Sequence, residues 1–92
     1  MGEWDFTDAV FAPHALQEME RRGLSVVDVR AVLAFPPRVH HVREGRVVIM
    51  ALFDPTARSQ FVMRVFVDID RARPVVVTAY RSRKIKKYWG QG

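Results

Sequence analysis

The 92-residue sequence contains no cysteine, so disulfides and thiolate metal sites are excluded and a reducing compartment, the cytoplasm, is expected. No apolar run approaches the roughly 20 residues needed to cross a bilayer. The N-terminal residues 1–5 are acidic and lack a basic region followed by an apolar stretch, so we expect no signal peptide. The five glycines do not cluster with lysine and serine or threonine, which excludes a P-loop-type phosphate site.

Positive charge, in contrast, is concentrated at one end. The chain has 15 Lys+Arg against 10 Asp+Glu, a net charge of +5. Five of these cations, including all three lysines, lie between Arg81 and Lys87, where there is no acid; the rest of the chain has no net charge. A pI near 10.4 favours an anionic partner such as nucleic acid. The basic segment 81–92 is therefore a candidate functional region.

The first third of the chain predicts two helices. Ala12-Pro13 is typical of a helix start and Gly23 of a helix stop, which predicts a helix over about 13–22. Ser25-Val-Val-Asp28 fits a capping box, and Pro36-Pro37 ends the second helix. Because only two residues join the helices, we expect a tight αα unit.

From residue 38 onward the hydrophobic period changes to two, which predicts strands. Four strands are predicted at 38–43, 46–53, 60–69 and 74–80, with the longest loop at 54–59. A short aromatic segment at 4–7 could add an edge strand. Helices followed by strands predict one α+β domain over residues 1–92, with two N-terminal helices packed on a twisted, mainly antiparallel four-stranded sheet.

Alternation assigns side chains to faces of the sheet. In the last predicted strand it places Val75, Val77 and Ala79 on one face, and Val76, Thr78 and Tyr80 on the other. Arg64 interrupts an apolar strand and is expected on the face that carries Thr78 and Tyr80. A guanidinium there needs water, a carboxylate such as Asp68, or a phosphate; all three remain open.

The histidines do not indicate a metal site. His14 lies in the first turn of its helix, where the helix dipole disfavours the imidazolium, so it could act as a general base or be an ordinary surface or capping residue. His40 and His41 are neighbours in a strand, so their rings point to opposite faces and cannot chelate one ion. No Gly-x-Ser-x-Gly elbow surrounds Ser59 or Ser82, so no Ser/His/Asp triad is indicated.

The basic segment also contains Ile85, Tyr88 and Trp89. Cations interleaved with aromatic rings suit single-stranded nucleic acid, since the cations attract phosphates and the rings stack on bases. Alternatively the segment is a solvated chain end, or its aromatic residues fold back over the sheet. We expect Trp89 to dock on the sheet and the lysines to contact phosphate. The candidate RNA-binding residues are Arg81, Arg83, Lys86, Lys87 and Trp89.

Three blocks carry a resemblance to a known family: Phe11-x-x-His14-Ala-Leu-x-x-Met19-x-x-Arg22-Gly23-Leu24, Val29…Pro36, and Val76-Val-Thr78-x-Tyr80-Arg-x-x-Lys84-x-x-Lys87-Tyr-Trp89. Together they resemble DUF4258, a family of small bacterial proteins, over nearly the whole chain. The resemblance implies a fold of the barnase/EndoU/colicin/RelE-like (BECR) ribonuclease group. It further implies a metal-independent endoribonuclease without a cofactor, often a toxin with a cognate antitoxin. The step from fold to activity is analogy.

The resemblance also implies site residues. It assigns His14 as base or acid, places Arg22, Thr78 and Lys84 in the site, and lets Tyr80 protonate the leaving group or stack on a base. A 2′-oxygen would attack the adjacent phosphorus, with Lys84, Arg64 or Arg22 stabilising the phosphorane. The family often has arginine four residues after the histidine, where this chain has Glu18. The expected catalytic set is thus His14, Arg22, Arg64, Thr78, Tyr80 and Lys84.

Two function classes follow. The first is a toxin-type endoribonuclease that cleaves RNA without a metal ion. The second is a non-catalytic RNA-binding or protein-interaction module on the same fold, which the loss of a cation at Glu18 favours. As a third reading, the apolar side of the basic segment docks an antitoxin or a second copy of the chain.

Overall fold

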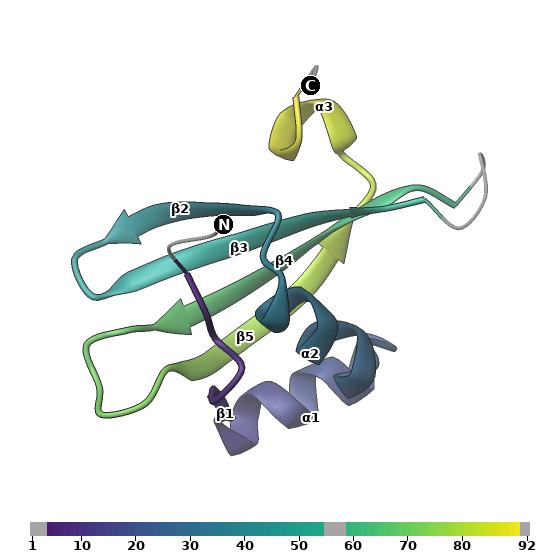
Figure 1. Ribbon diagram of the computed structural model, residues 1–92. Helices are drawn as coiled ribbons and strands as arrows, with labels where there is room; N and C mark the ends of the chain where they lie inside the picture. Colours follow the sequence, from purple (N-terminus) through teal and green to yellow (C-terminus); the bar gives the residue numbers. More distant parts are fainter. Residues whose placement is uncertain (1–3, 55–58, 91–92) are drawn as a thin grey trace.

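The computed structural model describes residues 4–54 and 59–90. It is an α+β fold with a five-stranded mixed sheet in the order β1-β5-β4-β3-β2 (Figure 1). No helix in the described part of the chain is long and apolar enough to span a membrane. The elements along the chain are β1 (Val10–Phe11), α1 (Pro13–Arg21), α2 (Val26–Ala34), β2 (Arg38–Arg43), β3 (Arg46–Phe53), β4 (Phe61–Asp68), β5 (Val75–Ser82) and α3 (Ile85–Tyr88).

The expected helices and their boundaries are confirmed. Gly23 follows α1 with φ +70°, a left-handed conformation that glycine adopts without steric penalty. The Ser25 hydroxyl accepts hydrogen bonds from the backbone N–H groups of Val27 and Asp28 at 3.0 and 3.4 Å, so it caps α2. The four antiparallel strands are also confirmed, with boundaries within two residues of those expected. Part of the expected loop, residues 55–58, lies outside the described residues.

The expectation of an edge strand at 4–7 is wrong. Asp5 accepts the backbone N–H of Thr7 at 3.0 Å, so the chain turns there, and Phe6 is buried in the core. The extra strand is β1, which pairs in parallel with β5 through Val10 and Phe11. The sheet is therefore five-stranded and mixed.

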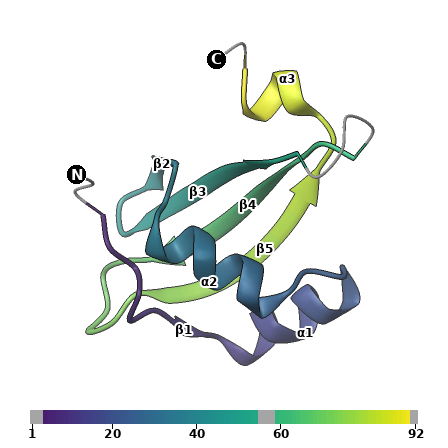
Figure 2. The same ribbon diagram turned by 45° about the vertical axis from the view of Figure 1, so that its right-hand side comes forward.

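The two faces of the sheet carry separate cores. Helices α1 and α2 cover one face and α3 lies over the other (Figures 1 and 2). The larger core, beneath α1 and α2, includes Met19, Leu33 and Ile49. On the opposite face Val48, Met50 and Val62 are buried, and α3 and the residue after it pack against them through Ile85, Tyr88 and Trp89. The expected docking of Trp89 on the sheet is confirmed.

A bulge in β5 corrects the expected face assignment. Val67 pairs with Val76 but Phe66 pairs with Thr78, so Val77 is an extra residue in β5. As a result Val76 and Ala79 both lie in the larger core, although strict alternation placed them on opposite faces. Beyond the bulge, Tyr80 pairs with Arg64 in register, as expected for residues of one face.

Candidate functional site

An open groove of about 510 Å³ lies between α3 and the sheet face that α1 and α2 leave uncovered. We call it the α3 groove. Its apolar walls include Val48 and Met50, and no aspartate or glutamate of the described part of the chain lines it. Its polar and aromatic lining residues are Arg38, His40, His41, Arg64, Lys87, Tyr88 and Trp89.

Arg64 lies in this groove among aromatic rings. Its guanidinium carbon lies 4.2 Å from the ring centroid of Tyr88, 5.2 Å from that of Phe66 and 5.6 Å from that of Tyr80. Arg64 Nη1 also donates a hydrogen bond to the Tyr80 hydroxyl. The negative faces of the rings offset part of the cost of burying this charge.

The carboxylate partner considered for Arg64 is engaged elsewhere. Asp68 accepts from Arg46 Nε at 2.6 Å and lies 3.8 Å from Arg71. The Arg46 hydrogen bond is the main reason that the pKa of Asp68 lies below its ordinary value. Within residues 4–54 and 59–90, no carboxylate pairs with Arg64, and its Nε is buried without a hydrogen-bond partner. Arg64 is thus a cation available to an anion that enters the groove.

A second arginine lies in the same row of the sheet. The register places Arg38 opposite Met50, Met50 opposite Arg64, and Arg64 opposite Tyr80. With a spacing of about 4.8 Å between strands, the backbones of Arg38 and Arg64 lie about 10 Å apart. The Arg38 guanidinium stacks 3.7 Å over the Trp89 ring and donates to the Trp89 carbonyl oxygen. The basic segment is therefore fastened to the sheet, and the reading as a solvated chain end does not hold for Trp89.

Two groups in the groove can exchange protons. The pKa of Tyr88 lies below the ordinary value of a phenol, first because of a hydrogen bond with Tyr80 and further because of Lys87 and Arg64. His40 lines the groove from β2, and histidine is the side chain best suited to proton transfer near neutral pH. Sequence reasoning considered this histidine only as a metal ligand.

A different set of charges joins α1 to β5. Glu18 lies at its centre: its Oε1 accepts a hydrogen bond from the Thr78 hydroxyl at 3.0 Å and forms an ion pair with Arg22 Nη1 at 2.9 Å. Its Oε2 lies 3.0 Å from Arg21 and 3.4 Å from His14 Nε2. We call these five residues the Glu18 cluster. The Thr78 hydrogen bond is the main reason that the pKa of Glu18 is lowered, so the carboxylate stays ionised.

The Glu18 cluster is satisfied from within the protein. Arg22 Nη1 bonds Glu18 and also donates to the backbone carbonyl oxygen of Ala79 at 3.0 Å and to Thr78 at 3.3 Å. These bonds hold α1 against the edge of β5. His14 is bound only at one ring nitrogen and its side chain is 72% exposed. The cluster therefore acts chiefly as a clamp, with His14 at its solvent side.

The structure divides the expected catalytic set. Arg64 and Tyr80 lie at the α3 groove, whereas His14, Arg22 and Thr78 belong to the Glu18 cluster. No hydrogen bond or ion pair between described residues links the two clusters. The last expected catalytic residue, Lys84, belongs to neither: it is the exposed N-cap residue of α3, and its N–H donates to Ser82 Oγ at 3.1 Å.

The expected RNA-binding residues are likewise divided. Lys87 and Trp89 line the α3 groove, and Lys86 is exposed on α3. Arg81 and Arg83 line a separate pocket at the end of β5. Among the described residues no group of three or more histidine, aspartate or glutamate side chains is placed to hold a metal ion.

The fold and the groove define a small α+β domain with a cationic, aromatic groove on one sheet face. The chain belongs to the DUF4258 family, a domain of unknown function whose family model matches residues 11–81. Neither the curated proteins nor the solved structures provide a match. The family match includes the Glu18 cluster, Arg64 and Tyr80 but ends before α3, so the wall of the groove that α3 forms lies outside it.

Sequence reasoning missed Glu18, Arg38 and Tyr88 as members of these clusters. Glu18 had one local signal, since Arg22 follows it by four residues on the same helix. Arg38 had none, because its partner Trp89 lies 51 residues away in sequence. Tyr88 was recognised only as part of the basic segment, since its neighbours come from β4 and β5.

Proposed function

We propose that this protein is a cytoplasmic endoribonuclease that binds single-stranded RNA in the α3 groove and cleaves it by attack of a 2′-hydroxyl. The observation that carries the proposal is Arg64, a cation in the groove that has no carboxylate partner among residues 4–54 and 59–90 and whose buried Nε has no hydrogen-bond partner among them. A phosphodiester would supply the missing negative charge. The α+β order of elements also supports assignment to the RelE-like ribonuclease group.

The proposed reaction is a transesterification. A base takes the proton from a 2′-hydroxyl, the oxygen bonds to the adjacent phosphorus, and the bond from phosphorus to the 5′-oxygen breaks. The 5′-oxygen takes up a proton and leaves, and the other product ends in a 2′,3′-cyclic phosphate. Arg64 and Arg38 would hold the phosphorane charge without a metal ion.

The groove also contains groups suited to the proton transfers. His40 is the proposed base, because it lines the groove while His14 lies with α1 on the opposite face of the sheet. Tyr88 is the proposed acid, because its lowered pKa makes it a better proton donor than an ordinary tyrosine. Tyr80 would keep Arg64 and Tyr88 in place by bonding both.

The decisive experiment is an RNA cleavage assay in EDTA that detects the 2′,3′-cyclic phosphate end. We expect Arg64→Met to lose roughly 100-fold or more of the activity, as removal of a transition-state donor does. His40→Ala should lose about 100-fold, while the matched variant His14→Ala should cleave like the wild type. Equal activity of Arg64→Met and the wild type, with both folded by circular dichroism, would contradict the proposed site. If His14→Ala were the one variant that lost activity, the catalytic site would lie at α1 and not in the α3 groove.

A second candidate function is RNA binding without cleavage. The observation that favours it is Glu18, which occupies Arg21, Arg22 and Thr78 in internal bonds. It predicts binding that weakens with salt and no cyclic phosphate product. Binding by all five cations between residues 81 and 87 would give a log–log salt slope no steeper than about −3.5. In either case a cognate antitoxin is the proposed protein partner, to be tested by co-purification with the product of an adjacent gene.

A further inference from the structure

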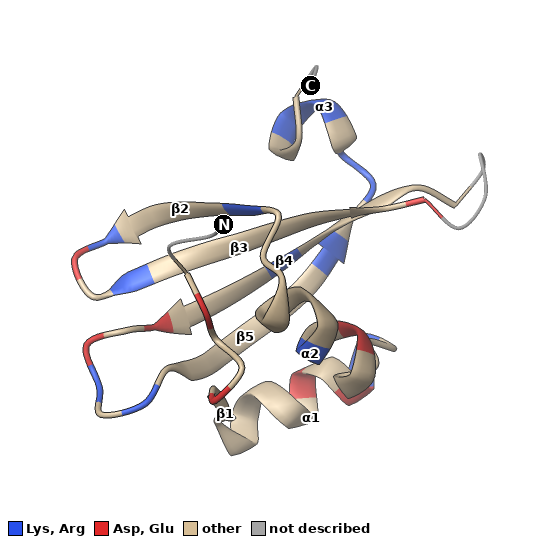
Figure 3. Ribbon diagram, viewed as in Figure 1, with Lys and Arg blue, Asp and Glu red and all other residues tan. Residues whose placement is uncertain are grey.

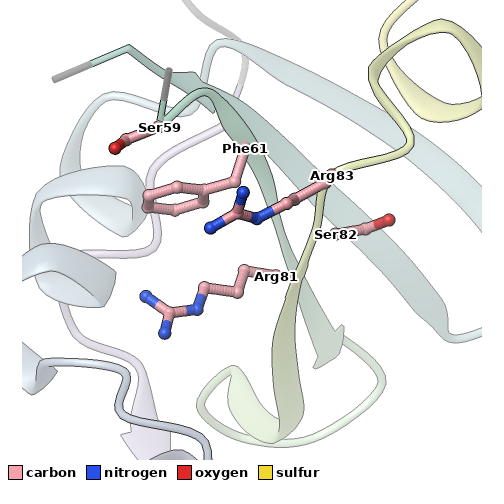
Figure 4. A pocket seen from close by; sticks show the side chains of 5 residues that line it. All are labelled: Ser59, Phe61, Arg81, Ser82 and Arg83. Carbon is pink, nitrogen blue, oxygen red and sulfur yellow. The ribbon is translucent and has the colours of Figure 1, made fainter. Parts of the chain in front are cut away.

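A second cationic pocket, of about 430 Å³, lies at the end of β5 on the helix-covered side of the sheet. Its lining residues are Ser59, Phe61, Arg81, Ser82 and Arg83. Figure 4 shows Phe61, Arg81 and Arg83 projecting to the same side, while the Ser82 side chain points away. We call it the Arg81 pocket. Its volume is within the range of small-ligand sites, and none of its lining residues that the structure describes is acidic.

Arg81 is held so that its N–H groups remain available. Its guanidinium lies 5.5 Å from the ring centroid of Phe61, and Phe61 in turn stacks on Phe53 at 5.1 Å with the ring planes 3° apart. Arg81 Nη2 also lies close to the end of α1, since a Cβ on Gly23 would be only 3.7 Å from it. A guanidinium at this cation–π distance is attracted to the ring face without using its N–H groups, which remain able to bind an oxyanion.

The charges in the Arg81 pocket are not neutralised by described residues. Arg21 and Arg22 pair with Glu18, and Arg46 and Arg71 pair with Asp68. Among residues 4–54 and 59–90 neither Arg81 nor Arg83 makes an ion pair or a side-chain hydrogen bond. Two unpaired guanidiniums beside an aromatic ring and the Ser59 hydroxyl match the chemistry of a nucleotide, with its phosphate and its base.

The pocket and the α3 groove lie on the two sides of one strand end. Arg81 pairs with Met63 of the larger core, whereas Tyr80, one residue earlier, pairs with Arg64 of the groove. Residues 83 and 84 connect β5 to α3, and Arg83 itself lines the Arg81 pocket. Exposed cations of this connection, Arg83 and Lys84, would accompany a strand that passes from one site to the other.

We propose that the Arg81 pocket is a phosphate subsite for an RNA nucleotide beyond those in the α3 groove, so that the bound strand turns around the end of β5. This inference rests on the proposed RNA binding. It specifies a substrate that is single-stranded and long enough to reach both sites, because a rigid duplex could not follow so sharp a turn.

The test compares two RNA lengths and three variants by fluorescence anisotropy. The RNAs are single strands of about 4 and about 12 nucleotides, spanning the usual range of site sizes. We expect Arg81→Gln/Arg83→Gln to bind the long RNA at least about tenfold more weakly and the short RNA like the wild type. Its salt slope for the long RNA should shrink by about 1.4, the contribution of two phosphates. The control Arg71→Gln/Arg73→Gln removes the same charge in the turn between β4 and β5, at the other end of β5 from Arg81, where neither residue lines the pocket or the groove, and should cause neither change.

The outcomes separate this inference from the proposed function. Arg64→Met should weaken binding of both RNAs, because the groove serves both lengths. If Arg81→Gln/Arg83→Gln binds the long RNA like its control while Arg64→Met binds both RNAs more weakly, the Arg81 pocket is not a phosphate subsite. RNA binding in the α3 groove would then still be supported. If wild-type protein binds neither RNA, adenosine 5′-monophosphate decides by NMR: amide shifts at Phe61, Arg81 and Arg83 that inorganic phosphate does not reproduce would support a nucleotide pocket, and their absence would refute it.

Discussion

The Glu18 cluster and the α3 groove each combine arginine with a hydroxyl-bearing residue of β5, which is Thr78 in the cluster and Tyr80 beside Arg64 at the groove. The two sites differ in charge balance. In the Glu18 cluster one carboxylate has four neighbours, and Arg22 Nη1 is held by Glu18, Thr78 and the Ala79 carbonyl oxygen. In the groove Arg64 has aromatic neighbours and, among residues 4–54 and 59–90, no acidic one. Figure 3 shows the same contrast across the molecule: acidic and basic segments adjoin at the turns beside β3 and β4, while α3 and the end of β5 are basic only. Arginines whose charge is balanced by a carboxylate of the protein indicate a structural role. Arginines whose charge is not balanced in this way indicate a site for an anionic ligand.

The largest effect is expected from substitutions of Arg64, the arginine that lies among aromatic rings in the groove. Arg64→Met should abolish most RNA cleavage, by roughly 100-fold, because it removes the charge that faces the phosphate. Arg64→Lys tests the geometry, since an ammonium keeps the charge but not the planar fork. Single-turnover cleavage measures both variants. Cleavage by Arg64→Lys at the wild-type rate would show that charge alone matters in the groove.

A similar loss is expected at the proposed acid. Tyr88→Phe keeps the ring that stacks on Arg64 but removes the phenol, so cleavage should fall by about 100-fold while RNA binding persists. The pKa of Tyr88 lies below the ordinary 10.0, so the wild type should form its first tyrosinate at lower pH than the variant. An ultraviolet titration measures this difference. Coincident titration curves would contradict the Tyr80 hydrogen bond.

In the Glu18 cluster the expected loss is in stability instead. Arg22→Met removes the hydrogen bond to the Ala79 carbonyl oxygen, worth about 1 kcal/mol, which corresponds to a decrease in Tm of about 4–8 °C in a domain of this size. RNA cleavage measured well below the Tm should be unchanged. The exposed variant Arg21→Met is the matched control. A large loss of cleavage with no change in Tm would make Arg22 a functional residue.

A smaller effect is expected in the acid range. The pKa of Glu18 is lower in the folded protein than its ordinary 4.5, so its ionised form stabilises the fold above that pH. This contribution is lost as the pH falls from 4.5 through the lowered value. Glu18→Gln should therefore be less stable than the wild type at neutral pH, and the difference should shrink in acid. A difference in urea midpoints that is constant with pH would exclude a charged role.

The smallest effect separates two neighbouring lysines. Lys87 lines the groove and Lys86 is exposed outside it. Lys87→Gln should lower the salt slope of RNA binding by about 0.7, and Lys86→Gln should lower it less. Equal slopes for the two variants would indicate diffuse attraction by α3 instead of contact within the groove.

The sequence predicts the regular elements well because their signals are local. Pro13, Gly23 and Ser25 mark helix ends by their own backbone chemistry, and alternation marks four strands. It does not predict β1, since two residues carry no period, nor the bulge at Val77. The sequence also does not predict that the expected site residues fall into two separate clusters. Arg38 contacts Trp89, and Glu18 contacts Thr78, only in the folded protein, across 51 and 60 residues of sequence.

Because Val77 is an extra residue in β5, the alternation of side chains between the two faces of the sheet shifts at this point of the strand. Before Val77, Val76 packs in the larger core. After it, Thr78 bonds Glu18 of α1 and Tyr80 bonds Arg64 of the groove. Deleting Val77 would remove no polar side chain but would rotate one half of the strand relative to the other. Either Val76 would leave the core or Tyr80 would leave Arg64. One apolar residue without a polar atom in its side chain thus allows the same strand to build a core and to present a polar site.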